Sequence, residues 1–297
     1  MTRAMAESRI LQGRTIASQI ESGLRGEIVR LPAAPQLRVL YFDSPASRVY
    51  WHAQQAAAVR LGIRTGAPGN DWKTGSVELP WDTPWTQVER ILQAWNADNS
   101  VHGIFVHQPM PPQIDPQQVS AVIDPRKDVE GIHPENSARR FFARARIGSC
   151  TALAVMELIE STGIALEGKE AVVVGHSDIV GRPVSMLLLD KLATTTVCHV
   201  GTDRAGQLEA HVRRADVLVV AAGRPHLIKG EWVKQGSIVI DVGINVKDGH
   251  VVGDVEFESA KKRAAAITPV PGGVGPVTVM MVMKNTVEAF KQQTGRA

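Results

Sequence analysis

Cysteine is nearly missing from this chain. Only Cys150 and Cys198 occur, so at most one disulfide bond could form and a disulfide framework is excluded. The sequence also has no Cys-x-x-Cys pair and no Cys/His spacing typical of a zinc site. We therefore expect no bound metal, and a protein that resides in the reducing cytoplasm.

Long apolar runs are absent as well. No segment approaches the roughly 18–20 consecutive apolar residues that cross a membrane. The first ten residues, MTRAMAESRI, lack the apolar core of a signal peptide. These absences predict a cytoplasmic protein that has no membrane partner.

The chain also lacks a concentrated cluster of positive charge. The chain has 33 Lys and Arg against 30 Asp and Glu, for a net charge of +3. Its densest basic stretch, residues 139–146, holds only four arginines. Proteins that bind nucleic acids concentrate basic residues on one helix or one face, so we expect no nucleic-acid partner.

The chain does contain a regular alternation of strands and helices. Its 297 residues suffice for about two domains. In the first half, apolar spacing predicts buried strands over 36–42 and 103–106, and helices over 14–30, 45–61 and 84–96. Ser44 is the expected N-cap of the second helix, with Pro45 at its first position and Gly62 after its end. This order is typical of an α/β domain with a parallel sheet.

A second α/β unit is predicted from about residue 150. Thr151 is the expected cap of a helix that runs to Glu160, and a further helix is expected over 180–191. Strands are expected over 170–174, 195–198, 217–221 and 237–242, which gives the order of a Rossmann-type domain. A last helix, over 277–292, is expected to pack on the first domain.

The segment VVVGHSDIVGRP, residues 172–183, indicates a dinucleotide site. Gly175 ends a hydrophobic strand and Gly181 opens a helix, where a helix N-terminus can bind a pyrophosphate. Ser177 replaces the middle glycine of the usual motif, so a purely structural turn remains an alternative. The strings AAGRP (221–225) and DVGIN (241–245) place small residues at the carboxyl ends of two later strands, where such ligands bind.

Together, these strings resemble the methylenetetrahydrofolate dehydrogenase/cyclohydrolase family. The matching strings are LQGRTIA (11–17), PASRVY (45–50), NADN (96–99), KDVEGIHP (127–134), GHSDIVGRP (175–183), DVGIN (241–245), VGDV (252–255) and ITPVPGGVGPVT (267–278). The resemblance implies two α/β domains with a cleft between them: an N-terminal folate-binding domain (1–149 plus 277–297) and a C-terminal Rossmann-type dinucleotide-binding domain (150–276). It also implies a homodimer.

The resemblance assigns site residues. It implies that Tyr50, Gln54, His107 and Glu130 are the catalytic positions, with Tyr50 stacked on the pterin. The implied substrate-binding residues are Ser47, Tyr50, Val106, Gln108, Pro271, Gly272, Gly273 and Thr278. The implied cofactor-binding residues are Thr151, Gly175, His176, Ser177, Ile179, Val200, Gly223, Gly243 and Ile244. A core aromatic remains an alternative for Tyr50, and a surface salt bridge for Glu130.

The chain departs from the family pattern mainly on the substrate side. Gln54 stands where the family has lysine, His107-Gln108 where it has Gln-Leu, Glu130 where it has aspartate, and Ala152 where it has proline. Hydride removal from a methylene carbon between two nitrogens needs no general base, whereas hydrolysis of the methenyl product needs a proton carrier. A glutamine amide cannot carry protons. We therefore expect weak or lost cyclohydrolase activity, unless His107 carries the protons in place of the lysine. The alternative for His107 is that it merely replaces glutamine as a hydrogen-bonding group, in which case the loss stands.

The resemblance implies NADP as the cofactor, with NAD as the alternative. His176 stands where some members carry arginine for the 2′-phosphate, Val200 offers no charge, and Arg204 is near enough in sequence to substitute. Two other functions stay open. The protein could bind folate or dinucleotide without turnover, or it could oxidise a related one-carbon substrate.

Overall fold

The computed structural model describes residues 8–66, 71–142 and 146–296. The start of the MTRAMAESRI segment, residues 1–7, and residues 143–145 of the basic stretch lie outside this part. The chain divides into two compact units. Unit 1 comprises residues 1–18 and 151–278, and unit 2 comprises residues 19–150 and 279–297. The boundary between residues 18 and 19 falls inside the long helix α1 (Gly13–Ile28), and the boundary between residues 278 and 279 falls inside the long helix α11 (Val274–Gln293).

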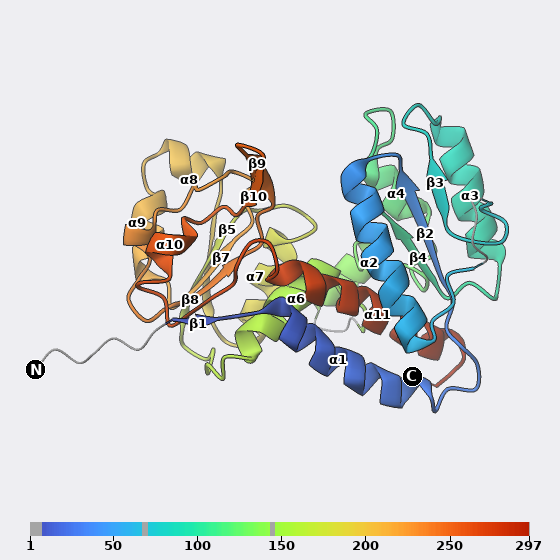
Figure 1. The fold of residues 1–297 in the computed structure, drawn as a ribbon, viewed down its shortest axis with the longest axis horizontal. Coiled ribbons are helices and arrows are strands. Elements are labelled where there is room, and N and C mark those ends of the chain that lie inside the picture. Colours follow the sequence, from blue (N-terminus) through green and yellow to red (C-terminus); the bar gives the residue numbers. More distant parts are fainter. Residues whose placement is uncertain (1–7, 67–70, 143–145, 297) are drawn as a thin grey trace, which may run out of the picture. The chain divides into compact units, whose positions relative to one another are not determined.

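Unit 1 is built on a parallel six-stranded sheet, drawn with its helices in Figure 1. The strand order is β1-β11-β8-β7-β5-β6. The strands are β1 (Arg9–Ile10), β5 (Glu170–Val174), β6 (Thr194–Cys198), β7 (Val217–Val220), β8 (Ile238–Asp241) and β11 (Ala266–Ile267). A separate antiparallel pair follows β8: β9 (Asn245–Lys247) and β10 (His250–Val252). The helices of unit 1 are α6 (Cys150–Glu160), α7 (Gly181–Asp190), α8 (Val200–Arg204), α9 (Leu208–Arg214), η1 (Gly230–Trp232) and α10 (Phe257–Ala260).

The sheet of unit 1 is covered on one face by a hydrophobic core. Alternate residues of β5 and β7, such as Val172 and Leu218, pack with Leu208 and Val212 of α9 and Ala260 of α10. Strands β5 and β7 are almost fully buried and rich in β-branched residues, as expected for the central strands of a parallel sheet covered on both faces. This covering leaves the ends of the strands as the places where a ligand can bind.

Unit 2 has a smaller parallel sheet, in the order β3-β2-β4. Its strands are β2 (Leu37–Phe42), β3 (Val77–Leu79) and β4 (Gly103–Val106), and its helices are α2 (Pro45–Leu61), α3 (Trp85–Ala97), α4 (Pro116–Val122) and α5 (Pro134–Phe141). The apolar face of α3, with Val88, Leu92 and Trp95, packs with Leu40 and Ile104 of the sheet. Figure 1 shows α3 and α2 on opposite sides of this sheet.

The start and end of α2 follow from its flanking residues. The Ser44 hydroxyl accepts a hydrogen bond from the Ser47 amide at 3.1 Å, and Pro45 occupies the first turn. Gly62 ends the helix in the left-handed region, at φ +74°, where glycine is favoured. The expected cap of α2 is therefore confirmed, whereas the cap expected at Thr151 is wrong. Helix α6 already begins at Cys150, so Thr151 lies within its first turn.

The described residues include no helix that combines the length and the apolar character of a membrane span.

Candidate functional site

The dinucleotide half of the candidate site lies at the carboxyl edge of the unit 1 sheet. Strands β6, β5, β7 and β8 are neighbours and parallel, so the residues that follow them share one edge. The chain passes from β5 to β6 on one side and then to β7 on the other. Such a reversal point is where open α/β sheets bind ligands.

The turn after β5 brings backbone segments into close contact. Gly175 has a φ of +123°, and a Cβ there would lie 2.2 Å from the Ala221 carbonyl oxygen. A Cβ on Gly181 would lie 2.1 Å from the Gly175 carbonyl oxygen. The Ser177 hydroxyl accepts from the Val180 amide at 3.2 Å, which stabilises the turn in place of the missing glycine. The first turn of α7 has no acidic residue, so its positive end can attract a phosphate.

The residues after β6 carry no free carboxylate for a ribose hydroxyl. His199 caps α8 by accepting from the Gly201 amide, and its ring centroid lies 5.3 Å from that of His176. Asp203, the acidic residue of α8, is paired with Arg224 at 2.6 Å. The predicted residues His176, Ser177 and Val200 are all exposed at this edge.

The other predicted cofactor residues lie in unit 1 at varied places. Gly223 follows β7 with a φ of +63°, and Gly243 and the exposed Ile244 follow β8. Thr151 lies in the first turn of α6 and Ile179 in the turn before α7, both partly buried. The two loops after β7 and β8 thus share the edge with Gly175.

Four predicted substrate residues also belong to unit 1. The loop with Pro271, Gly272 and Gly273 follows β11 and leads into α11. Gly13, at the start of α1, donates from its amide to the Gly272 carbonyl at 2.9 Å. The Thr278 hydroxyl donates to a carbonyl of its own helix, that of Val274, at 3.2 Å. These residues lie in a different unit from the remaining substrate positions.

The remaining substrate positions converge in unit 2. Ser47, Tyr50 and Gln54 lie at i, i+3 and i+7 of α2, and His107 directly follows β4. The His107 Nε2 lies 2.7 Å from the Gln54 Oε1, and the ring centroids of His107 and Tyr50 are 5.0 Å apart. The structure therefore brings together α2 and the end of β4. Val106 is buried at the end of β4, whereas Gln108 is exposed.

His107 is buried in an uncharged state. Burial lowers the pKa of its imidazole to about 3. Because an amide oxygen can only accept, the contact with Gln54 places a proton on the His107 Nε2. Among the described residues, neither the His107 Nδ1 nor the Gln54 Nε2 has a hydrogen-bond partner. These two buried polar atoms can bind the polar groups of a ligand.

Glu130 contributes a carboxyl group to the same region of unit 2. Burial, with a smaller contribution from Asp128, raises the pKa of Glu130 to about 8. Burial also raises the pKa of Tyr50, and the next largest contributions come from Cys150 and Glu130. Tyr50 and Glu130 therefore interact electrostatically in the same region of unit 2.

The loop that carries Glu130 is fixed by two of its neighbours in the sequence, Lys127 and Asp128. The Asp128 carboxylate accepts from the amides of Gly131 at 2.9 Å and His133 at 2.8 Å. Lys127 donates to three carbonyls at the end of α3, those of Trp95, Asn96 and Asp98. Both residues stand in the KDVEG string, so its first two letters fix the loop that carries its fourth, Glu130.

Asn285 of α11 also fixes this region. Its amide donates to the carbonyls of Val129 and Gly148, each at 2.9 Å, and to the Cys150 sulfur at 3.3 Å. No local pattern around residue 285 signals this role, because its partners lie more than a hundred residues away in sequence.

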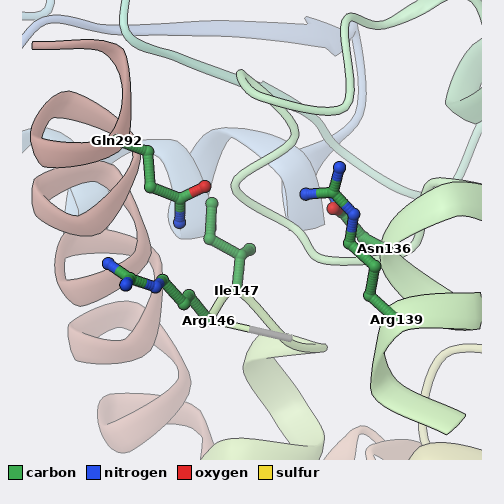
Figure 2. A pocket seen from close by; sticks show the side chains of 5 residues that line it. All are labelled: Asn136, Arg139, Arg146, Ile147 and Gln292. Atoms are coloured by element: carbon green, nitrogen blue, oxygen red, sulfur yellow. The ribbon is translucent and has the colours of Figure 1, made fainter. Parts of the chain in front are cut away.

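A pocket of about 140 Å³ lies elsewhere in unit 2, and Figure 2 shows the side chains that line it. They are Asn136, Arg139, Arg146, Ile147 and Gln292. Arg139 is paired with Glu135, and Arg146 with Glu288 at 3.6 Å. None of the predicted site residues lines this pocket. The described residues also include no cluster of three or more His, Cys, Asp or Glu side chains suited to a metal ion.

Comparison with known proteins agrees with this geometry in both units. Residues 11–130 match the tetrahydrofolate dehydrogenase/cyclohydrolase catalytic domain, and residues 149–294 match the NAD(P)-binding domain of the same family. The "Bifunctional protein FolD" of Halothermothrix orenii is 46% identical over 289 residues, which cover 95% of this chain and 98% of that protein.

Solved structures give the same result. The methylenetetrahydrofolate dehydrogenase-cyclohydrolase of Trypanosoma brucei, solved with NADP and an inhibitor, is 39% identical, with a TM-score of 0.90 and coverage of 99% of this chain and 100% of that chain. The enzyme FolD from Campylobacter jejuni is 36% identical, with a TM-score of 0.88 and coverage of 96% and 99%. With two domain matches and full-length relatives above 30% identity, the chain belongs to the tetrahydrofolate dehydrogenase/cyclohydrolase family.

Proposed function

We propose that this protein is a 5,10-methylene-tetrahydrofolate dehydrogenase that transfers a hydride to NADP and has little cyclohydrolase activity. The observation that carries the proposal of little cyclohydrolase activity is the buried contact between His107 and Gln54, at 2.7 Å. Gln54 stands where the family has a lysine. Family membership, with relatives named for both activities, supports the first part.

The cofactor residues of unit 1 fit a dinucleotide. Gly175 allows a backbone approach that no side chain would permit, and the α7 N-terminus offers amides and a positive dipole to the pyrophosphate. NADP supplies the hydride acceptor when bound. We assign recognition of its 2′-phosphate to His176 and His199, whose rings lie next to each other at this edge. The nearby carboxylate of Asp203 is already paired with Arg224, so its negative charge is compensated.

Dehydrogenation makes modest demands on the residues of unit 2. The reacting carbon lies between two nitrogens, whose lone pairs stabilise the cation left when the hydride departs. The protein must orient the substrate, which can contribute up to about 7–11 kcal/mol. We assign that task to Tyr50, which offers a ring face to the pterin, and to Glu130, which accepts from pterin N–H groups.

Hydrolysis of the methenyl product demands a proton carrier. Water loses a proton as it attacks, and a ring nitrogen gains one as the intermediate opens. Gln54 does not ionise, and the low pKa of His107, about 3, keeps its imidazole neutral and weakly basic near pH 7. This pair can hold a water or a carbonyl by hydrogen bonds, but it is poorly suited to shuttle protons.

Both half-reactions, measured on the purified protein with NADP and with NAD, test the proposal. We expect reduction of NADP with methylene-tetrahydrofolate and hydrolysis of methenyl-tetrahydrofolate close to the spontaneous rate. Hydrolysis comparable to the dehydrogenase rate would contradict the second part. Binding without NADP reduction would instead favour a non-catalytic binding protein, and absent folate binding would favour another one-carbon substrate.

Two variants separate the roles of the pair. Gln54→Lys places an amine beside His107, and we expect it to raise hydrolysis by about a hundredfold, the low end of proton-transfer contributions. His107→Ala is expected to change hydrolysis little. If the wild type hydrolyses well and His107→Ala abolishes this, His107 is the proton carrier.

The remaining assignments follow from the motifs. We propose that residues 1–149 with 277–297 bind the folate and residues 150–276 bind the dinucleotide. This functional division follows the family strings and differs from the packing units at the N-terminal segment, because β1 pairs with β11. The two buried free cysteines support a cytoplasmic location. The homodimer is proposed from the family resemblance alone.

A further inference from the structure

A buried carboxylate, that of Asp254, lies behind the loops at the carboxyl edge of unit 1. It is fully buried and follows β10. One oxygen accepts from the amides of Ala222 at 2.6 Å and Gly223 at 2.9 Å. The other accepts from the Arg224 amide and the Asn245 side-chain amide, both at 2.8 Å. All four donors are neutral amide groups.

These donors belong to the two loops where cofactor residues were predicted. Residues 222–224 follow β7, and Asn245 ends the loop after β8. A buried carboxylate stabilises every amide that points at it, since hydrogen bonds to charged groups contribute about 1.5–3 kcal/mol each. Asp254 therefore fixes both loops from their buried side, while Gly223 and Ile244 are exposed.

A second carboxylate, that of Asp241, holds Asp254 in place. It accepts from the amides of Gly243 at 3.0 Å, Asp254 at 3.1 Å and Val255 at 2.9 Å. The Asp241 amide donates to the Thr268 hydroxyl at 2.8 Å. The end of β8 and the segment after β10 are thus fixed together.

The packing around the two carboxylates leaves no space for side chains. A Cβ on Gly243 would lie 2.3 Å from the Asp254 carboxyl carbon, and a Cβ on Gly253 would lie 2.0 Å from the Asp241 Oδ2. The glycines of the strings DVGIN and VGDV are therefore required by the carboxylates. The strings act as one interlocked unit, although they lie on different segments.

We propose that Asp254 is a positioning residue for the dinucleotide, which sets the backbone of residues 222–224 and 243–245 in the conformation that receives it. It acts through these loops and does not touch the reacting atoms. The inference rests on the proposed function for the identity of the ligand.

The test compares Asp254→Asn with the matched control Asp216→Asn in the full-length protein. Asparagine keeps the size but turns an N–H group toward amide donors, which leaves buried donors unpaired. Asp216 also accepts hydrogen bonds, from the Glu170 amide at 3.0 Å and from Lys234 at 2.7 Å, but it lies at the opposite edge of the sheet. NADPH binding is measured by fluorescence without folate, so the result does not depend on turnover.

We expect Asp254→Asn to weaken NADPH binding by about tenfold or more, and to speed amide hydrogen exchange at residues 222–224. Asp216→Asn should change neither. Unchanged NADPH affinity in a folded Asp254→Asn variant would overturn the inference, even if its melting temperature fell.

If Asp254→Asn fails to fold, Asn245→Ala serves instead, because it removes one of the four donors. We expect it to weaken NADPH binding by about threefold, with methylene-tetrahydrofolate KM within twofold of the wild type. Equal affinity in this variant would also overturn the inference. A wild type that binds NADPH but does not oxidise the folate would refute the proposed function alone.

Discussion

We expect the raised pKa of Glu130 to make the proposed recognition of the folate depend on pH. Pterin N–H groups bind an ionised carboxylate more strongly than a neutral carboxyl group, and the pKa of about 8 keeps the Glu130 carboxyl mostly protonated at pH 7. The ionised fraction rises from about 0.09 at pH 7 to about 0.91 at pH 9. We therefore expect kcat/KM for methylene-tetrahydrofolate, measured at saturating NADP, to rise about tenfold over this interval.

The variant Glu130→Gln isolates this effect. An amide cannot ionise, so we expect a lower and flatter profile than that of the wild type. Other groups that titrate near this pH range are the same in the wild type and the variant. The pKa of Asp241, raised by burial to about 7, contributes to both profiles, whereas the His107 pKa of about 3 lies outside. Profiles of equal slope in the two proteins would refute the reasoning.

The same carboxyl has a stability consequence of known sign. Its pKa is raised on folding, so the folded state holds a proton that the unfolded chain releases above its ordinary pKa of 4.5. Stability is therefore lost as pH rises from about 4.5 to 8. The variant Glu130→Gln should melt at a higher temperature than the wild type at pH 8 but not at pH 4.5. A lower melting temperature of the variant at pH 8 would contradict this expectation. Gly175→Ala should abolish NADPH binding and destabilise unit 1 by about 1–3 kcal/mol or more. The reason is that φ at this position is +123° and the added Cβ meets the Ala221 carbonyl. Near-normal NADPH affinity in calorimetry would contradict the turn geometry. Asn285→Ala removes three buried hydrogen bonds and should lower the free energy of unfolding by about 1–3 kcal/mol in a urea titration, with a raised folate KM; an unchanged midpoint would show that water replaces the amide.

Most of the fold follows from local sequence. The strand from Gly103 to Val106 and the strand from Glu170 to Val174 have the predicted bounds, because short β-branched runs between polar segments allow few alternatives. The strands at residues 9–10 and 266–267 were not predicted. Each has only two residues, and their pairing joins segments more than 250 residues apart, which no local pattern encodes.

The candidate site, too, could be predicted only in part from local sequence. Residues on one helix face, such as Tyr50 and Gln54, could be grouped from spacing alone. The contact between Gln54 and His107 required the structure, because it joins α2 to the end of β4 across 53 positions. The neutral state of His107 also required it, because burial, and not sequence, sets that pKa.

The two halves of the family's chemistry place different demands on the chain, and the substitutions follow that difference. The turn at Gly175 and the loops fixed by Asp254 depend on backbone contacts that tolerate no added Cβ at Gly175, Gly243 or Gly253. The substrate side depends on side chains, which can change without altering the fold. Replacing a lysine by Gln54 removes a proton carrier but leaves a buried, hydrogen-bonded pair of similar size. Because hydride transfer needs orientation and hydrolysis needs a proton, this exchange should suppress the second reaction and spare the first.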